Sequence, residues 1–105
     1  MTPSPGSPYQ IVCPQAQRIL LPRWAREAAA RGQLAPFLAA LQTLNDRLAR
    51  DPEVWGDPQY RLPHSGMVLY HRIISPLRVV YAVDPGRRLV FIKAFLRYPS
   101  PDVGP

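Results

Sequence analysis

Arg78, Lys93 and Arg97 lie inside the two most apolar stretches of the chain, where charged side chains are unexpected. Both stretches belong to the segment LRVVYAVDPGRRLVFIKAFLRY, residues 77–98. Arginine binds phosphate through two parallel hydrogen bonds from its planar guanidinium, and lysine adds a compact point charge. If the three cations share one surface, they can bind a phosphodiester and stabilise the negative charge that develops when it is cleaved.

Cleavage of RNA by its own 2′-hydroxyl also requires a general base and an acid for the leaving 5′-oxygen, and it requires no metal. Among the available side chains, His71 has the ordinary pKa that lies nearest to neutral pH. The candidates for these two roles are His64, His71, Lys93 and Tyr98. A single histidine in a strand is more often structural than catalytic. The alternative role for the strand arginines is an ion pair with Asp57 or Glu53.

The charge of the chain is concentrated in its second half. The net charge is +6, and 12 of the 13 cations are arginines. Between Tyr60 and Tyr98 there are seven cations, including Arg61 and Arg72, and one acid, Asp84, so this segment alone carries the whole net charge. Such an asymmetry favours an anionic partner, either a nucleic acid or an acidic protein. A basic surface that only meets water is the alternative.

Several classes of protein do not fit this sequence. No apolar run reaches the 18 residues of a membrane span, and the N-terminus lacks the pattern of a signal peptide. Cys13 is the only cysteine, so an intrachain disulfide is impossible and a cytoplasmic location is expected. One cysteine and two histidines do not make a usual zinc site. We therefore expect no cofactor and no membrane partner.

The first half of the chain is predicted to form a strand and two helices. Residues 9–13 have the composition of a short strand. Alanine and arginine predict a helix over residues 15–31, in which Pro22 either opens the helix or kinks it. A second helix is predicted over residues 35–50, because one apolar stripe recurs there at helical spacing. The residues of this stripe are Phe37, Leu41, Leu44 and Leu48.

The second half is predicted to form a loop followed by three strands. Prolines and glycine indicate a loop over residues 53–65. Apolar, β-branched segments predict strands over residues 67–74, 77–83 and 88–97, separated by turns. The resulting order, β-α-α-β-β-β, predicts an α+β fold in which a helical hairpin packs on one face of an antiparallel sheet.

The distribution of prolines predicts the limits of the domain. The 14 prolines of the chain crowd into both ends and the loops. We expect one domain over residues 9–98, with flexible proline-rich tails over residues 1–8 and 99–105.

Alternation along the last two strands predicts the surface on which the cations lie. If Val83 pairs with Arg88, then Arg78 lies opposite Lys93, and the cations share the face turned away from the helices. A two-residue turn at Ser75-Pro76 would bring His71 to the same face, and Arg72 to the opposite one. Phe91 and Phe95 would lie among the cations, an arrangement typical of RNA binding, with arginine for phosphates and rings for bases. The residues predicted to bind RNA are Arg61, Arg72, Phe91 and Phe95. A solvated sheet face is the alternative.

Over residues 9–98 the chain resembles the RelE/ParE toxin superfamily. The resemblance rests on the first strand, the helical hairpin, the segments DPEVWGDPQYRL and LRVVYAV, and the basic end of the last strand. It implies one of two activities. RelE-like members cleave messenger RNA in the ribosomal A site, whereas ParE-like members inhibit DNA gyrase without acting as nucleases. Both are neutralised by a cognate antitoxin of a type II toxin–antitoxin system.

The resemblance also implies roles for individual residues. Arg78 matches the arginine of the third strand of the family, Arg97 matches the basic position that ends the fourth, and Tyr98 matches a C-terminal tyrosine. Lys93 matches in location only. The glycine-basic-basic segment usual in the family is replaced by Ala94-Phe95-Leu96. We therefore expect a RelE-like toxin that cleaves or binds ribosome-bound mRNA. The alternatives are a gyrase inhibitor and an inactive member of the same fold.

Overall fold

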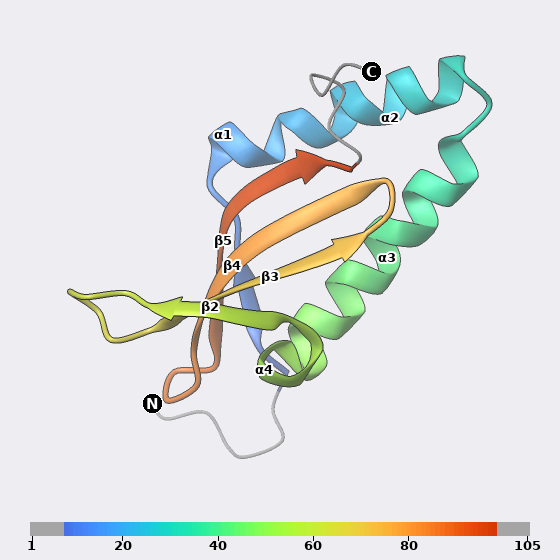
Figure 1. Cartoon of the computed structure of the whole chain (residues 1–105). Helices are drawn as coiled ribbons and strands as arrows, with labels where there is room; N and C mark the ends of the chain where they lie inside the picture. Colours follow the sequence, from blue (N-terminus) through green and yellow to red (C-terminus); the bar gives the residue numbers. More distant parts are fainter. Residues whose placement is uncertain (1–7, 99–105) are drawn as a thin grey trace.

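The chain folds into a five-stranded mixed sheet with helices packed beside it, as a computed structural model shows (Figure 1). The structure describes residues 8–98, so the tails predicted over residues 1–8 and 99–105 lie outside the described residues, except for Pro8. The strands are β1 (Gln10–Val12), β2 (Asp57–Arg61), β3 (Val68–Ile74), β4 (Leu77–Asp84) and β5 (Leu89–Arg97). Their spatial order is β1-β5-β4-β3-β2. This architecture confirms the α+β class.

The sheet differs from the prediction in two ways. It is mixed and not purely antiparallel, because β1 runs parallel to β5. It also gains an edge strand, β2, which pairs with β3 inside the segment predicted as a loop. All five residues of β2 are exposed and one of them is Pro58, so the apolar alternation that normally reveals a strand is absent. The prolines favoured a loop in the prediction, but an edge strand tolerates a residue that has no backbone N–H to donate.

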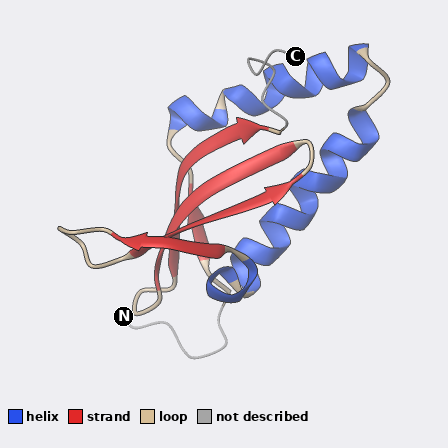
Figure 2. Ribbon diagram, viewed as in Figure 1, coloured by secondary structure: helices blue, strands red, loops and turns tan. Residues whose placement is uncertain are grey.

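The two predicted helical segments are helical, the first with one division, and a further short helix, α4 (Pro52–Trp55), lies where a loop was predicted (Figure 2). The predicted segments contain α1 (Gln15–Arg18), α2 (Leu20–Ala30) and α3 (Leu34–Arg50). The predicted helix over residues 15–31 is interrupted at Ile19, because Pro22 has no N–H to donate to the carbonyl of Arg18. Gly32, with a φ of 70°, ends α2 in the left-handed conformation.

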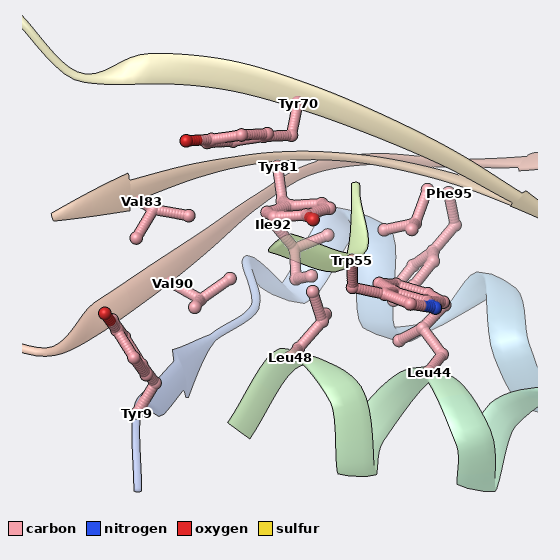
Figure 3. Packing of buried hydrophobic residues seen from close by; sticks show 11 residues of the cluster. Tyr9, Leu44, Leu48, Trp55, Tyr70, Tyr81, Val83, Val90, Ile92 and Phe95 are labelled. Atoms are coloured by element: carbon pink, nitrogen blue, oxygen red, sulfur yellow. The ribbon is translucent and has the colours of Figure 1, made fainter. Parts of the chain in front are cut away.

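The helices cover one face of the sheet. The predicted stripe of α3 is confirmed: Phe37, Leu44 and Leu48 are buried, and Leu41 is partly buried against them. Leu44 and Leu48 pack with the residues of β4 and β5 that face the helices. That set consists of Val79, Tyr81, Val83, Val90, Ile92 and Phe95. Figure 3 labels all of them except Val79. We refer to the opposite side of the sheet, which carries the alternate residues, as the open face.

Tyr81 lies at the centre of the core and is fully buried. Its hydroxyl donates a hydrogen bond of 2.5 Å to the carbonyl of Pro52, which begins α4. Its ring stacks on Tyr70, with centroids 5.5 Å apart, and on Trp55 at 6.4 Å. Figure 3 shows the three rings in succession between β3 and α4. Tyr81 therefore joins the middle of the sheet to the turn that leads into β2.

The pairing of β3 with β4 follows the prediction. Ile73 lies opposite Arg78 across the turn at Ser75-Pro76. This register directs His71 to the open face, where Val80 is its neighbour, and it directs Arg72 to the side of the helices.

The predicted pairing of β4 with β5 is wrong. Val83 lies opposite Val90 and not Arg88, so Arg78 faces Leu96 and not Lys93. This two-residue shift keeps Val90 and Ile92 on the side of the core. A bulge then makes Lys93 an extra residue, since Val80 pairs with Ala94 while Tyr81 pairs with Ile92.

The bulge reverses the faces of the residues that follow it. Phe95, predicted on the open face, is buried in the core, whereas Leu96, predicted inside, is 42% exposed. Because one extra residue shifts the two-residue period by one step, simple alternation along the sequence could not reveal this reversal.

Gly56 makes a close approach to Tyr81 that leaves no room for a side chain. A Cβ atom at this position would lie 2.1 Å from the Tyr81 hydroxyl oxygen and 2.8 Å from its Cζ. We expect Gly56→Ala to lower the free energy of unfolding by about 1–3 kcal/mol, the usual cost of overpacking. Urea denaturation would measure the change. Gly86→Ala, whose nearest contact would be 3.6 Å, is the control and should change it little. Equal stability of the two variants would contradict this packing.

Burial of Tyr81 predicts a loss of stability at alkaline pH. Burial raises the pKa of the Tyr81 hydroxyl above its ordinary value, and the neighbouring Tyr70 raises it further. The unfolded chain loses this proton from about pH 10 upward while the folded chain keeps it, so the stabilisation is present below pH 10 and declines above it. The slope reaches at most about 1.4 kcal/mol per pH unit. Denaturation of the wild type and of Tyr81→Phe between about pH 9 and 11 should give curves that converge; parallel curves would contradict the prediction.

Candidate nucleic-acid interface

The open face carries three of the predicted site residues: His71 from β3, Arg78 from β4 and Lys93 from β5. Arg78 lies between Ile73 and Leu96 on the neighbouring strands. Lys93 and Ala94 share this face, because the bulge separates the inward-facing Ile92 from the inward-facing Phe95. Residues on diagonal positions of neighbouring strands are about 7–8 Å apart, so His71 and Arg78 reach a common space. The structure thus places an imidazole and two cations on one face of the sheet.

Arg78 has no internal partner in the part of the chain that the structure describes. It is half-buried, and its Nε atom is enclosed without a hydrogen-bond partner. Lys93 is exposed and, among residues 8–98, forms no ion pair. The enclosed Nε is out of reach of an external group. The guanidinium as a whole has no internal acceptor in the described range, so an anion that accepts from its terminal N–H groups would bind favourably.

His71 lies beside a carboxylate that comes from the unpredicted edge strand. Asp57, the first residue of β2, pairs with His71, and the distance from its Oδ2 to the imidazole Nε2 is 4.0 Å. The His71 side chain is 23% exposed, and its Nδ1 has no hydrogen-bond partner within residues 8–98. Sequence analysis considered Asp57 only as a partner for arginine. Its contact with His71 depends on β2, which the composition of the segment concealed.

Arg97 does not reach this site. It faces the helices, where its guanidinium forms an ion pair with Glu27 of α2 and lies over the Trp24 ring, 5.0 Å from the centroid. Tyr98 directly follows β5, and its backbone N–H bonds to the Pro76 carbonyl at 2.9 Å. Its side chain is 44% exposed. The structure therefore separates Arg97 from Arg78, the two arginines that the resemblance pairs in one site.

The predicted RNA-binding residues are divided between the two faces. Arg72 donates to the Trp55 carbonyl at 3.0 Å and lies over the Trp55 ring. Arg61 donates to the Gly66 carbonyl at 2.7 Å, within the connection between β2 and β3. Phe95 lies in the core. Of this group, Phe91 alone lies on the open face, where it is partly buried beside Ala82.

An apolar row crosses the open face next to the polar residues. Pairing across the sheet aligns one residue from each strand, in the order Tyr60, Leu69, Ala82, Phe91 and Val12. Tyr60 is the most exposed of the large apolar side chains in this row, at 59%. Sequence analysis missed Tyr60 as a surface residue because it lies in β2.

A cleft of about 400 Å³ lies away from these residues, between the β2–β3 connection and the turn after β4. Its lining includes Glu53, Arg61, Tyr70 and Asp84. The polar groups of the cleft are largely engaged: Glu53 accepts from the Tyr9 hydroxyl, and Asp84 pairs with Arg87. The cleft does not include His71, Arg78 or Lys93, which lie on the open face of the sheet.

Residues 8–98 contain neither a candidate metal-binding cluster nor a candidate membrane-spanning helix. Within that range, no group of three or more histidine, cysteine, aspartate or glutamate side chains is placed to hold a metal ion. Nor does this part of the chain contain a helix that is both long and apolar enough to cross a membrane. No family model, curated protein or solved structure matches the chain.

The contacts of Arg97 predict a structural role that Arg78 does not share. An ion pair of this exposure contributes up to about 1 kcal/mol, and a cation–π contact adds about 0.5–1 kcal/mol. We expect Arg97→Ala to lower the free energy of unfolding by about 1–2 kcal/mol, and Arg78→Ala to lower it by less than about 0.5 kcal/mol. Chemical denaturation of both variants provides the comparison. Equal losses would show that the two arginines do not differ in this way.

Proposed function

We propose that the chain is a RelE-like toxin that binds ribosome-bound messenger RNA on the open face and cleaves it without a metal. The observation that carries the proposal is that Arg78, Lys93 and His71 lie on one face of the sheet, and that neither cation has a partner among the described residues. The other strand cations, Arg61, Arg72 and Arg97, contact the protein itself. Cations left without internal partners on one face favour an anionic ligand.

In the proposed reaction, the 2′-hydroxyl of the RNA attacks the adjacent phosphorus. His71 accepts the proton of that hydroxyl, the P–O5′ bond breaks, and the 5′-oxygen takes a proton from the ammonium of Lys93. Arg78 donates hydrogen bonds to the phosphate oxygens, whose charge increases in the transition state. Asp57 lies beside the imidazole, with its Oδ2 atom 4.0 Å from Nε2. Arg97 stabilises the fold through Glu27 and Trp24 and takes no direct part in the reaction.

A second candidate function, inhibition of DNA gyrase by a ParE-like protein, has an observation in its favour. Ile73 and Leu96, on either side of Arg78, are 40% and 42% exposed. Arginine is enriched at protein-binding hot spots, and exposed side chains around it can exclude water from such a contact. Under either function, we propose that the natural partner of the chain is a cognate antitoxin and that the protein acts in the cytoplasm.

The test is the effect of Arg78→Ala on RNA cleavage. Loss of charge-assisted hydrogen bonds to phosphate should cost about 1.5–3 kcal/mol, which is roughly ten- to a hundredfold in rate. Arg78→Lys should be nearly as defective, because lysine cannot form the bidentate contact. Cleavage would be mapped by primer extension on messages translated in a cell-free extract. Arg26→Ala removes the same charge from an exposed position of α2 and is the matched control.

The outcomes distinguish the two candidate functions. Cut messages with the wild type, and far fewer with Arg78→Ala but not with Arg26→Ala, would support the RNA-directed function. Intact messages together with blocked supercoiling by purified gyrase would support the ParE-like function instead. Unchanged translation and unaffected gyrase would refute both.

A further inference from the structure

We infer that the open face takes its RNA as a single strand that crosses the strands of the sheet, with one unpaired base stacked on Tyr60. The inference rests on the proposed RNA-directed function and extends it by naming the form of the substrate and a further binding residue. Tyr60 lies on β2, at the edge of the sheet (Figure 1).

The first observation is the exposure of the Tyr60 ring. The residue is 59% exposed, and in the described range neither its hydroxyl nor its ring has a partner. The other tyrosines within the sheet behave differently, since Tyr70 and Tyr81 are buried and stack on one another. An exposed aromatic ring without internal contacts contributes little to the fold and is available as a stacking platform.

The second observation is the position of Tyr60 relative to the cations. Its partner in the sheet is Leu69, which places it in the apolar row that also contains Phe91. The next row on the open face contains Asp57, His71, Val80 and Ala94. The bulged Lys93 lies between these two rows on β5, and Arg78 belongs to the row beyond, between Ile73 and Leu96. Rows on one face of a sheet are two residues, or about 7 Å, apart. An RNA whose phosphates lie at Lys93 and Arg78 would therefore have neighbouring bases within reach of the apolar row.

The direction and strandedness of the RNA follow from these rows. Both rows run across the strands, and the step from Phe91 on β5 to Tyr60 on β2 covers three strand spacings, roughly 14 Å. A base can stack on a side chain only when it has left its own helix, so a duplex cannot use Tyr60 in this way. The Asp57 carboxylate repels phosphate at this edge, and the two cations lie away from it, Arg78 on β4 and Lys93 on β5. A base stacked on Tyr60 would therefore bind the RNA at the β2 edge of the sheet, which the two cations do not reach.

The experiment measures binding of three labelled probes by fluorescence anisotropy. The probes are a single-stranded RNA 12-mer with 2′-O-methyl groups that prevent cleavage, the duplex of the same sequence, and an abasic ribose-phosphate 12-mer. The proteins are the wild type and the variants Tyr60→Ala, Tyr60→Phe, Arg78→Ala and Val54→Ala. Val54 is 79% exposed on α4 and is the control for an exposed apolar side chain.

Tyr60→Ala should weaken binding of the single strand about five- to a hundredfold, the effect of losing one stacked base. Tyr60→Phe and Val54→Ala should bind it as the wild type does. Neither the duplex nor the abasic probe should distinguish Tyr60→Ala from the wild type, because neither offers a free base. A folding defect would weaken binding of every probe and would appear as a lowered melting temperature.

Other results would overturn the inference. If Tyr60→Ala binds the single strand normally while Arg78→Ala binds it poorly, the inference fails and the RNA-directed function stands. If Arg78→Ala also binds normally, or if the wild type binds no probe, both fail. If Tyr60→Ala weakens binding of all three probes equally, then Tyr60 stabilises the surface and does not stack on a base.

Discussion

One extra residue in β5 decides which side chains reach the open face. The bulge at Lys93 interrupts the pairing of β4 with β5, so that the residues before and after it obey opposite alternations. Without this extra residue, Arg97 would lie on the same face of the sheet as Arg78, and Phe95 would lie outside the core. With it, Phe95 fills the core, while Arg97 is directed to Glu27 and Trp24. Burial of the Phe95 ring stabilises this arrangement, since an aromatic side chain contributes a large apolar area.

Tyr81, which lies in the core, fixes the position of the sheet edge that β2 forms. Its hydroxyl and ring hold α4 through Pro52 and Trp55, and Gly56 lies against it where no side chain fits. The chain then enters β2 directly at Asp57, which this arrangement positions beside His71. A contact in the core therefore locates a carboxylate on the surface. The exposed sequence of β2 supplies little of the energy that holds it in place.

The cations of the sheet fall into two groups according to what they contact. Arg61, Arg72 and Arg97 satisfy their guanidinium groups with backbone carbonyls, a carboxylate or an aromatic ring of the protein itself. Arg78 and Lys93 have no such contacts among the described residues, and both lie on the open face. The net charge of +6 is thus a poor guide to the interface, because much of the positive charge serves the fold. The unsatisfied cations are the more specific signal for a ligand.

The sequence by itself determined the α+β class, the helical segments that became α1 to α3, the apolar stripe of α3 and the pairing of β3 with β4. Each of these follows from local chemistry: helical periodicity, a proline that interrupts a helix, and a two-residue turn at Ser75-Pro76. Only the tertiary structure decided the parallel position of β1, the existence of β2, and the reversal after Lys93. Those features depend on pairing between distant segments. A fully exposed edge strand has no apolar pattern, and a bulge is one residue whose placement depends on how Phe95 packs. The candidate site was therefore predicted in part: His71 and Arg78 follow from alternation, whereas Asp57, Tyr60 and the removal of Arg97 arise from contacts that no local pattern encodes.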